Sequence, residues 1–132
     1  MRIVIDTNVW ISRLLLADSV AAQAVDKALE QSDVMVSEAT LTELADVLAR
    51  DKFDKYLSIT DREQFLRHLT RITTIAPVLS EVTDCIDSKD NQFLALAFDS
   101  ESDLILTGDS DLLTLSPWRG IEITSPRAFL TA

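Results

Sequence analysis

The sequence predicts one α/β domain over residues 1–132, with a central parallel sheet of about five strands between two layers of helices. Two patterns predict this three-layer α/β/α architecture. Short apolar segments typical of buried strands recur along the chain, and segments with helical spacing of apolar residues separate them. Strands that alternate with helices pair in parallel through right-handed crossovers. A length of 132 residues with only two glycines and three prolines fits one domain with few irregular loops.

The first half of the chain contains two predicted strands and three predicted helices. Residues 2–6 (RIVID) and 33–37 (DVMVS) are short apolar segments of the kind that parallel sheets bury on both faces. A helix is predicted after residue 6 from the spacing of Val9, Trp10, Ile11, Leu14 and Leu15, and a second over 19–31. Ser37 is the predicted cap of a third helix that begins near Glu38 and packs through Leu41, Leu44, Ala45 and Leu48.

The second half continues the alternation. Thr60 is the predicted cap of a helix over 60–72, and Pro77 shortens a strand candidate at 73–79. Ser88 or Asp87 is predicted to cap a helix from about residue 89 to residue 100, which is apolar on every side from residue 93 to 98 and should be packed on most sides. Residues 103–107 and 120–125 complete the predicted sheet.

Composition excludes several classes of protein. The single Cys85 excludes a disulfide framework, and no apolar run is long enough to cross a membrane, so we expect a cytoplasmic protein. The net charge of −10 argues against nucleic-acid binding, but the charge is uneven. Nine of the 22 acids lie between Glu81 and Asp111, whereas six of the 12 bases lie between Arg50 and Arg71. Two solvated faces of opposite sign would explain this equally well.

Aspartates follow two of the predicted strands directly. Asp6 ends the segment RIVID, and Asp109 and Asp111 follow DLILTG. The carboxyl ends of parallel strands meet at one edge of a sheet, which is where ligands bind. Asp90 at a helix start and Glu43, which lies off the apolar stripe of its helix, are placed to join them.

Each acid alone has an ordinary explanation, since Asp6 fits a helix cap, Asp90 a partner of the helix dipole, Asp109 a turn and Glu43 a solvated face. Together they would repel one another unless a cation were bound. Carboxylates with a single histidine, His68, favour Mg²⁺, with Mn²⁺ as an alternative, and make zinc a poor candidate.

A carboxylate-bound divalent cation suits phosphoryl chemistry. The sequence has no Walker loop, no Gly-x-Gly-x-x-Gly turn and no Gly-x-Ser-x-Gly, so nucleotide-cofactor enzymes and serine hydrolases are poorly supported. A receiver-type phosphoacceptor domain needs an aspartate after its third strand and a lysine on its fifth. Residues 73–81 contain no aspartate and residues 120–125 contain no lysine.

Four motifs resemble those of the PIN-domain family, and most closely those of the small prokaryotic toxins of the VapC type. They are MRIVIDTNVWIS at the start, SEATLTELADVL with Glu43, DSKDNQFLALA with Asp90, and LILTGDSDLL with Asp109. They occur in the family's order and span essentially the whole chain. The combination is far more specific than any one aspartate.

The resemblance implies a sheet of order 3-2-1-4-5 and a Mg²⁺-dependent endoribonuclease that acts as the toxin of a type II toxin–antitoxin pair. It implies Asp6, Glu43, Asp90 and Asp109 as the cation-binding acids. In the mechanism that we expect, Asp6, Asp90 and Asp109 hold the cation, and Glu43 orients the attacking water. Asp111 shares or replaces the role of Asp109 in this interpretation, and the supporting residues are Thr7, Asn8 and Thr107. The implied partners are RNA, an antitoxin protein and a second copy of the chain.

Three arginines are candidates for RNA binding, Arg13 beyond Asp6, and Arg67 and Arg71 one turn apart; each fits a solvated helix residue as well. Two alternatives stay open. One is a PIN fold that binds RNA or protein without catalysis, and the other is a nuclease directed at DNA, because one site can cut either backbone.

Overall fold

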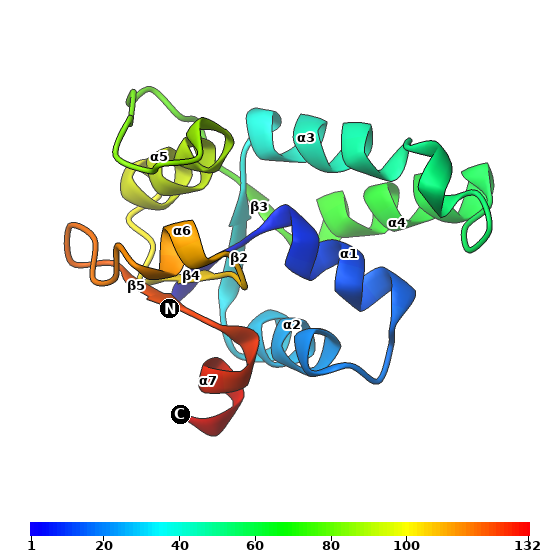
Figure 1. Ribbon diagram of the computed structural model, residues 1–132, viewed down its shortest axis with the longest axis horizontal. Coiled ribbons are helices and arrows are strands. Elements are labelled where there is room, and N and C mark those ends of the chain that lie inside the picture. Colours follow the sequence, from blue (N-terminus) through cyan, green and yellow to red (C-terminus); the bar gives the residue numbers. More distant parts are fainter.

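The computed structural model describes residues 1–132 as a five-stranded sheet with helices on both faces (Figure 1). All strands are parallel, and their order is β3-β2-β1-β4-β5, which confirms the expected order 3-2-1-4-5. Strand β1 lies at the centre between β2 and β4. The strands are β1 (Arg2–Ile5), β2 (Asp33–Val36), β3 (Thr74–Ile75), β4 (Leu104–Leu106) and β5 (Glu122–Thr124).

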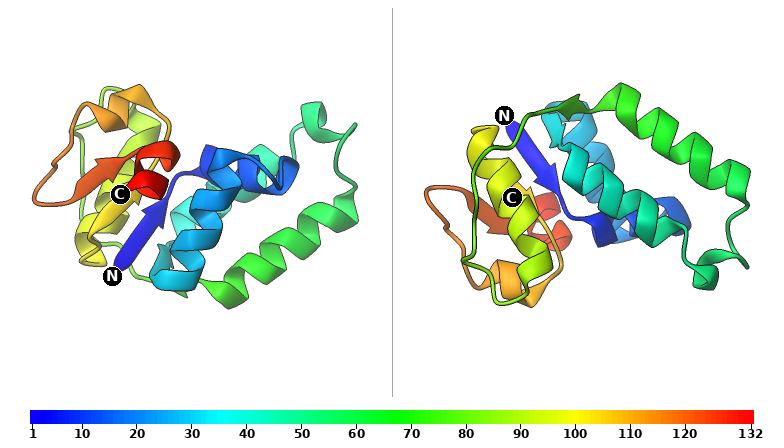
Figure 2. Two further views of the ribbon diagram at one scale, coloured as in Figure 1. Left: turned by 90° about the horizontal axis from the view of Figure 1, so that it is seen from below. Right: turned by 90° about the horizontal axis from the view of Figure 1, so that it is seen from above.

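Seven α-helices and two 3₁₀ turns connect the strands. The helices are α1 (Thr7–Leu15), α2 (Val20–Gln31), α3 (Glu38–Leu48), α4 (Ile59–Ile72), α5 (Asn91–Asp99), α6 (Ser110–Leu113) and α7 (Pro126–Thr131). The 3₁₀ turns are η1 (Asp51–Phe53) and η2 (Ser88–Asp90). The pair α3 and α4 extends beyond the β3 edge of the sheet (Figures 1 and 2).

The two faces of the sheet carry separate apolar cores, because successive side chains of a strand point to opposite faces. Ile3 and Ile5 of β1 pack with residues of α1, α2, α3 and α4, whereas Val4 packs with Phe93 and other residues of α5. Helix α5 is buried from Phe93 to Ala97, as its continuous apolar run predicts. Burial on both faces leaves the strand ends as the place where polar groups meet.

The helix boundaries confirm the predicted cap Ser37, correct Thr60, and decide between the alternatives Ser88 and Asp87. Ser37 caps α3, and Thr40 completes a reciprocal capping box with it. Thr60 is wrong as the cap of α4, because Ser58 accepts the hydrogen bond from the Asp61 amide. The predicted start near residue 89 is also shifted: a 3₁₀ turn capped by Asp87, not by Ser88, precedes α5.

The sheet edge shows the largest difference from the expected strands. Strand β3 has two residues instead of the seven predicted at 73–79, and both are exposed. Pro77 cannot donate to a neighbouring strand, so pairing stops before it. Helices α6 and α7 have no counterpart in the sequence prediction, since four and six residues are too few for helical periodicity to be recognised. No helix in the structure has both the length and the apolar character that a membrane span requires.

Candidate functional site

Strands β1 and β4 deliver the first two acids to one edge of the sheet. They are adjacent and parallel, with Ile5 opposite Leu106. The ladder extends one step further, because the Asp6 amide donates to the Leu106 carbonyl at 3.0 Å. The chain then turns into α1 after Asp6 and into α6 after Asp109 (Figure 1). The convergence expected from the sequence is therefore produced by the strand order.

Two threonine hydroxyls hold these carboxylates. Thr107 Oγ1 donates to Asp6 Oδ2 at 2.6 Å and accepts a hydrogen bond from the Asp109 amide at 3.0 Å. Thr107 is fully buried, so one hydroxyl links the ends of both strands. The hydroxyl of Thr7 donates to Glu43 Oε2, which ties α1 to α3. Thr7 and Thr107, singled out in the sequence, thus contact predicted site acids.

Asp90 is a further buried acid, and it lies close to Asp109. It ends the turn η2 at the start of α5 and is only 8% exposed. Its Oδ2 atom is buried and has no hydrogen-bond partner. Carboxylate oxygens of Asp87, Asp90 and Asp109 all lie within 4.8 Å of one another, which is close enough for one cation to contact all three. A buried carboxylate oxygen without a partner is costly unless a proton or a cation binds there.

Asp87 was not predicted from the sequence as a member of this cluster, only as a helix cap. A signal was available, because a 3₁₀ turn places residues three apart on the same side, and Asp87 and Asp90 have that spacing. Asp6, in contrast, is not part of the tightest group. It lies near enough for its charge to raise the pKa of Asp90.

The pKa shifts follow from this crowding of carboxylates. Burial and a hydrogen bond with Asp109 raise the pKa of Asp90 to about 8, and the charges of Asp109, Asp6 and Asp87 act in the same direction. The same hydrogen bond lowers the pKa of Asp109. Burial raises the pKa of Asp6, although the bond from Thr107 opposes the shift. The opposite shifts of Asp90 and Asp109 favour a proton on Asp90 and a charge on Asp109.

No basic side chain neutralises these acids. The four ion pairs of the structure join Arg2 to Glu101, Arg13 to Asp26, Arg62 to Asp54 and Arg119 to Asp84, and none includes a residue of the cluster. A group of carboxylates with hard oxygen donors and no cationic partner has the chemistry that Mg²⁺ or Mn²⁺ prefers.

The remaining predicted residues lie around the cluster in different ways. Asp111 donates its backbone amide to Asp109 Oδ1 at 2.9 Å, and its own side chain is outside the tight group. Asn8 is exposed and donates its amide to Asp6 Oδ1 at 3.4 Å. Arg13 is paired with Asp26 at 2.8 Å. Arg67 and Arg71 are exposed on α4 and make no ion pair, so no contact joins any of the three arginines to the acids.

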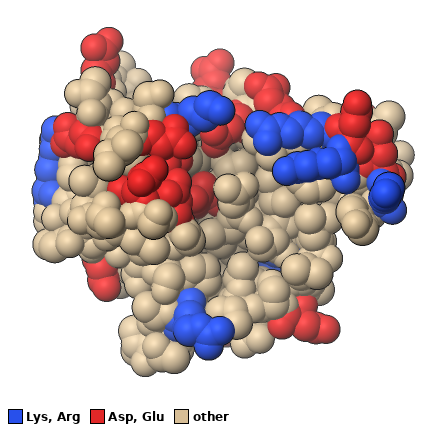
Figure 3. All heavy atoms as spheres, in the orientation of Figure 1, with Lys and Arg blue, Asp and Glu red and all other residues tan.

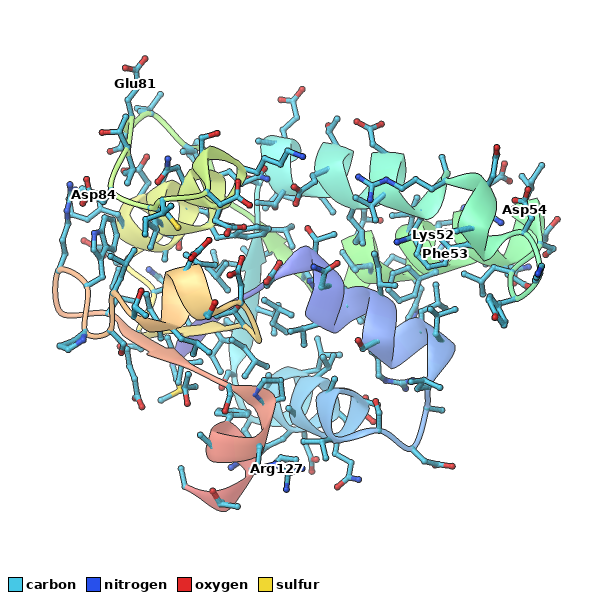
Figure 4. All side chains as sticks on the ribbon, viewed as in Figure 1. Lys52, Phe53, Asp54, Glu81, Asp84 and Arg127 are labelled. Atoms are coloured by element: carbon cyan, nitrogen blue, oxygen red, sulfur yellow. The ribbon has the colours of Figure 1, made fainter.

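Predicted site acids line two hollows. One of about 370 Å³ is lined by Asp6, Asn8, Ser12 and Asp109, among others. A larger open groove of about 1000 Å³ runs between the first half of α3, including Glu43, and residues 75–78. Acidic side chains gather over α5 and α6, whereas basic side chains gather over the far part of α3 and α4, where Lys52 lies (Figures 3 and 4). The unevenness of charge along the sequence is thus also an unevenness across the surface.

Comparisons with known proteins agree with this fold. Residues 2–111 match the PIN domain family. The protein MJ1680 of Methanocaldococcus jannaschii is 32% identical over 119 residues, which cover 87% of this chain and 75% of MJ1680. Among solved structures, the chain is similar to VapBC2 from Rickettsia felis bound to a DNA fragment from their promoter (TM-score 0.67, 10% identity, 95% and 98% of the two chains). It is also similar to VapBC-1 from nontypeable Haemophilus influenzae (TM-score 0.66, 13% identity, 96% and 99%).

Proposed function

The chain belongs to the PIN domain family, and from this premise we propose that it is a Mg²⁺-dependent endoribonuclease. It hydrolyses phosphodiester bonds of RNA and serves as the toxin of a toxin–antitoxin pair. The observation that carries the proposal is the buried Asp90 oxygen without a partner, which lies beside Asp109 with no basic residue to balance the charge. A structural role for Asp90 would require a hydrogen-bond donor at this position.

The site acids have separate roles in this proposal. Asp6, Asp90 and Asp109 hold the cation, and Asp111 stays a candidate to assist Asp109. The bound cation supplies positive charge to the scissile phosphate and to the leaving oxygen. Thr107 orients Asp6 and favours its charged form against the effect of burial, because its hydroxyl donates to the carboxylate.

Glu43 acts on the attacking water. Its carboxylate accepts a hydrogen bond from Thr7, which fixes one oxygen and leaves the other free to accept a proton from water. It lines the larger groove beside α3, where an extended strand of RNA can lie. In-line attack then needs the phosphate between Glu43 and the three aspartates.

Binding of RNA depends on the cation in this account. The chain carries a net charge of −10, and the acids gather around the site (Figure 3). A phosphate is repelled less strongly once the cation offsets part of this negative charge and offers it a direct contact. Arg67 and Arg71 have free guanidinium groups for contacts further along the RNA, whereas Arg13 must first leave Asp26.

The toxin assignment rests on the structural neighbours, which are VapBC complexes. An antitoxin partner follows from that likeness, and a homodimer stays a prediction. Expression of the wild-type chain alone should arrest growth of a bacterial host, and expression of Asp90→Asn should not.

Cleavage of a single-stranded RNA tests the proposed chemistry. Wild type should cleave the RNA with Mg²⁺, and cleavage should stop on addition of EDTA. Asp6→Asn should cleave at least about 100-fold more slowly. Glu30 is an exposed residue of α2, and the control variant Glu30→Gln should cleave at the wild-type rate. Cleavage in EDTA or full activity of Asp6→Asn would refute the proposal. Cleavage of single-stranded DNA alone would assign the chain to DNA, and RNA binding without cleavage would assign it to the non-catalytic class.

A further inference from the structure

Asp87 caps the turn η2, but capping alone does not require an acidic side chain at this position. Its Oδ1 accepts the Lys89 amide at 3.1 Å, and its backbone carbonyl accepts the Asp90 amide at 3.0 Å. Any of Ser, Thr, Asn or Asp can make such a cap. The second carboxylate oxygen of Asp87 accepts no hydrogen bond from the chain and is exposed to solvent.

The turn that carries Asp87 is fixed against α5. The Cys85 amide donates to Asn91 Oδ1 at 2.9 Å, so the chain before Asp87 and the chain after Asp90 are tied together. The turn therefore presents Asp87 and Asp90 on one side as a pair. Asp109 approaches from the end of β4, and oxygens of the three residues lie within 4.8 Å of one another.

The buried face of this group gives a second, independent indication of a ligand. Asp90 is only 8% exposed, and its Oδ2 atom has no hydrogen-bond partner. The group is open to solvent on the side of Asp87 and closed on the side of Asp90, so an ion can enter from Asp87. No ammonium or guanidinium group is paired with any of the three carboxylates.

We propose that Asp87 is a further ligand for a divalent cation at this site, which it binds together with Asp90 and Asp109. The inference rests on the proposed function, because it extends the cation site of the nuclease.

Asp87→Asn separates the two roles of this residue. Asparagine preserves the cap and keeps one carbonyl oxygen, but removes the charge. Glu81→Gln is the matched control: it removes one charge from the preceding loop, at a side chain that points away from the molecule (Figure 4). The affinity for Mn²⁺ is measured by calorimetric titration of wild type, Asp87→Asn, Asp90→Asn and Glu81→Gln. The titrations contain 0.15 M salt, which screens long-range effects of charge.

Asp87→Asn should weaken Mn²⁺ binding about tenfold or more, Asp90→Asn should abolish it, and Glu81→Gln should change it less than about twofold. Wild-type affinity in Asp87→Asn, with binding lost in Asp90→Asn, would overturn the role of Asp87 and leave the proposed nuclease intact. Failure of wild type to bind Mn²⁺ would overturn both. The melting temperature of Asp87→Asn in EDTA should equal or exceed that of wild type, which shows that the variant folds.

Discussion

Replacement of Thr107 by valine tests whether one buried hydroxyl organises the strand ends. Valine has nearly the same shape as threonine, so the packing of this fully buried side chain is preserved. The substitution removes the 2.6 Å bond to Asp6 Oδ2 and the 3.0 Å bond from the Asp109 amide. Both losses occur at the edge of the sheet where the acids meet.

The expected cost follows from these two bonds. A hydrogen bond to a charged group contributes about 1.5–3 kcal/mol, and the Asp109 amide loses a further neutral bond of about 1 kcal/mol. Part of this loss is recovered if water reaches the half-buried Asp109, so we expect the free energy of unfolding to fall by about 2–4 kcal/mol. For a chain of this size the melting temperature should fall by roughly 10 °C.

Urea unfolding and thermal melting in EDTA at pH 7 measure the effect, with Thr124→Val as the matched control. Thr124 is also buried at the end of a neighbouring strand, but its hydroxyl has no hydrogen-bond partner in the chain. Its replacement should change stability by less than about 0.5 kcal/mol. Thr107→Ser should recover most of the lost stability. A Thr107→Val protein as stable as Thr124→Val would refute the claim that this hydroxyl holds Asp6 and Asp109.

Three further predictions concern pH, capping and positioning. The pKa of Asp90 is about 8 in the folded chain and about 3.9 in the unfolded chain, so the cation-free fold should lose stability as pH rises from 5 to 9. Melting curves in EDTA should show a melting temperature that falls over this range. The fall should be smaller in Asp90→Asn. Ser58→Ala should cost about 1 kcal/mol in urea unfolding and Thr60→Ala almost nothing, and equal costs would contradict the observed cap. Thr7→Val should lower kcat about tenfold with little change in KM, because it removes the hydrogen bond that positions Glu43 and no contact to RNA. Thr7→Ser should restore kcat. A change in KM alone would argue against a positioning role for Thr7.

The central fold could be predicted because its signals are local. Apolar segments without alternation mark the buried strands, and Ser37 before Glu38 marks a helix start. The short elements could not be predicted from periodicity, since α6 has four residues and β3 has two. The cap of α4 was misplaced because Ser58 and Thr60 have the same chemistry two positions apart, and only the backbone decides between them.

The site could be predicted in part for a similar reason. Asp6 and Asp109 follow strands, so the parallel sheet alone brings them to one edge. The environment of Asp90 depends on how close β4 brings Asp109 to the turn η2, which no local pattern reports. Asp87 was assigned to capping, and capping uses only one of its two oxygens. The pairing of Arg13 with Asp26 across two helices is likewise a tertiary contact.

Anomalous diffraction from crystals soaked in Mn²⁺ tests the central claim that these acids form a cation site. We expect an anomalous peak about 2.1 Å from carboxylate oxygens of Asp90 and Asp109. The absence of an anomalous peak at this edge of the sheet at saturating Mn²⁺, with the Asp90 oxygen still without a partner, would contradict the claim that these acids bind a cation.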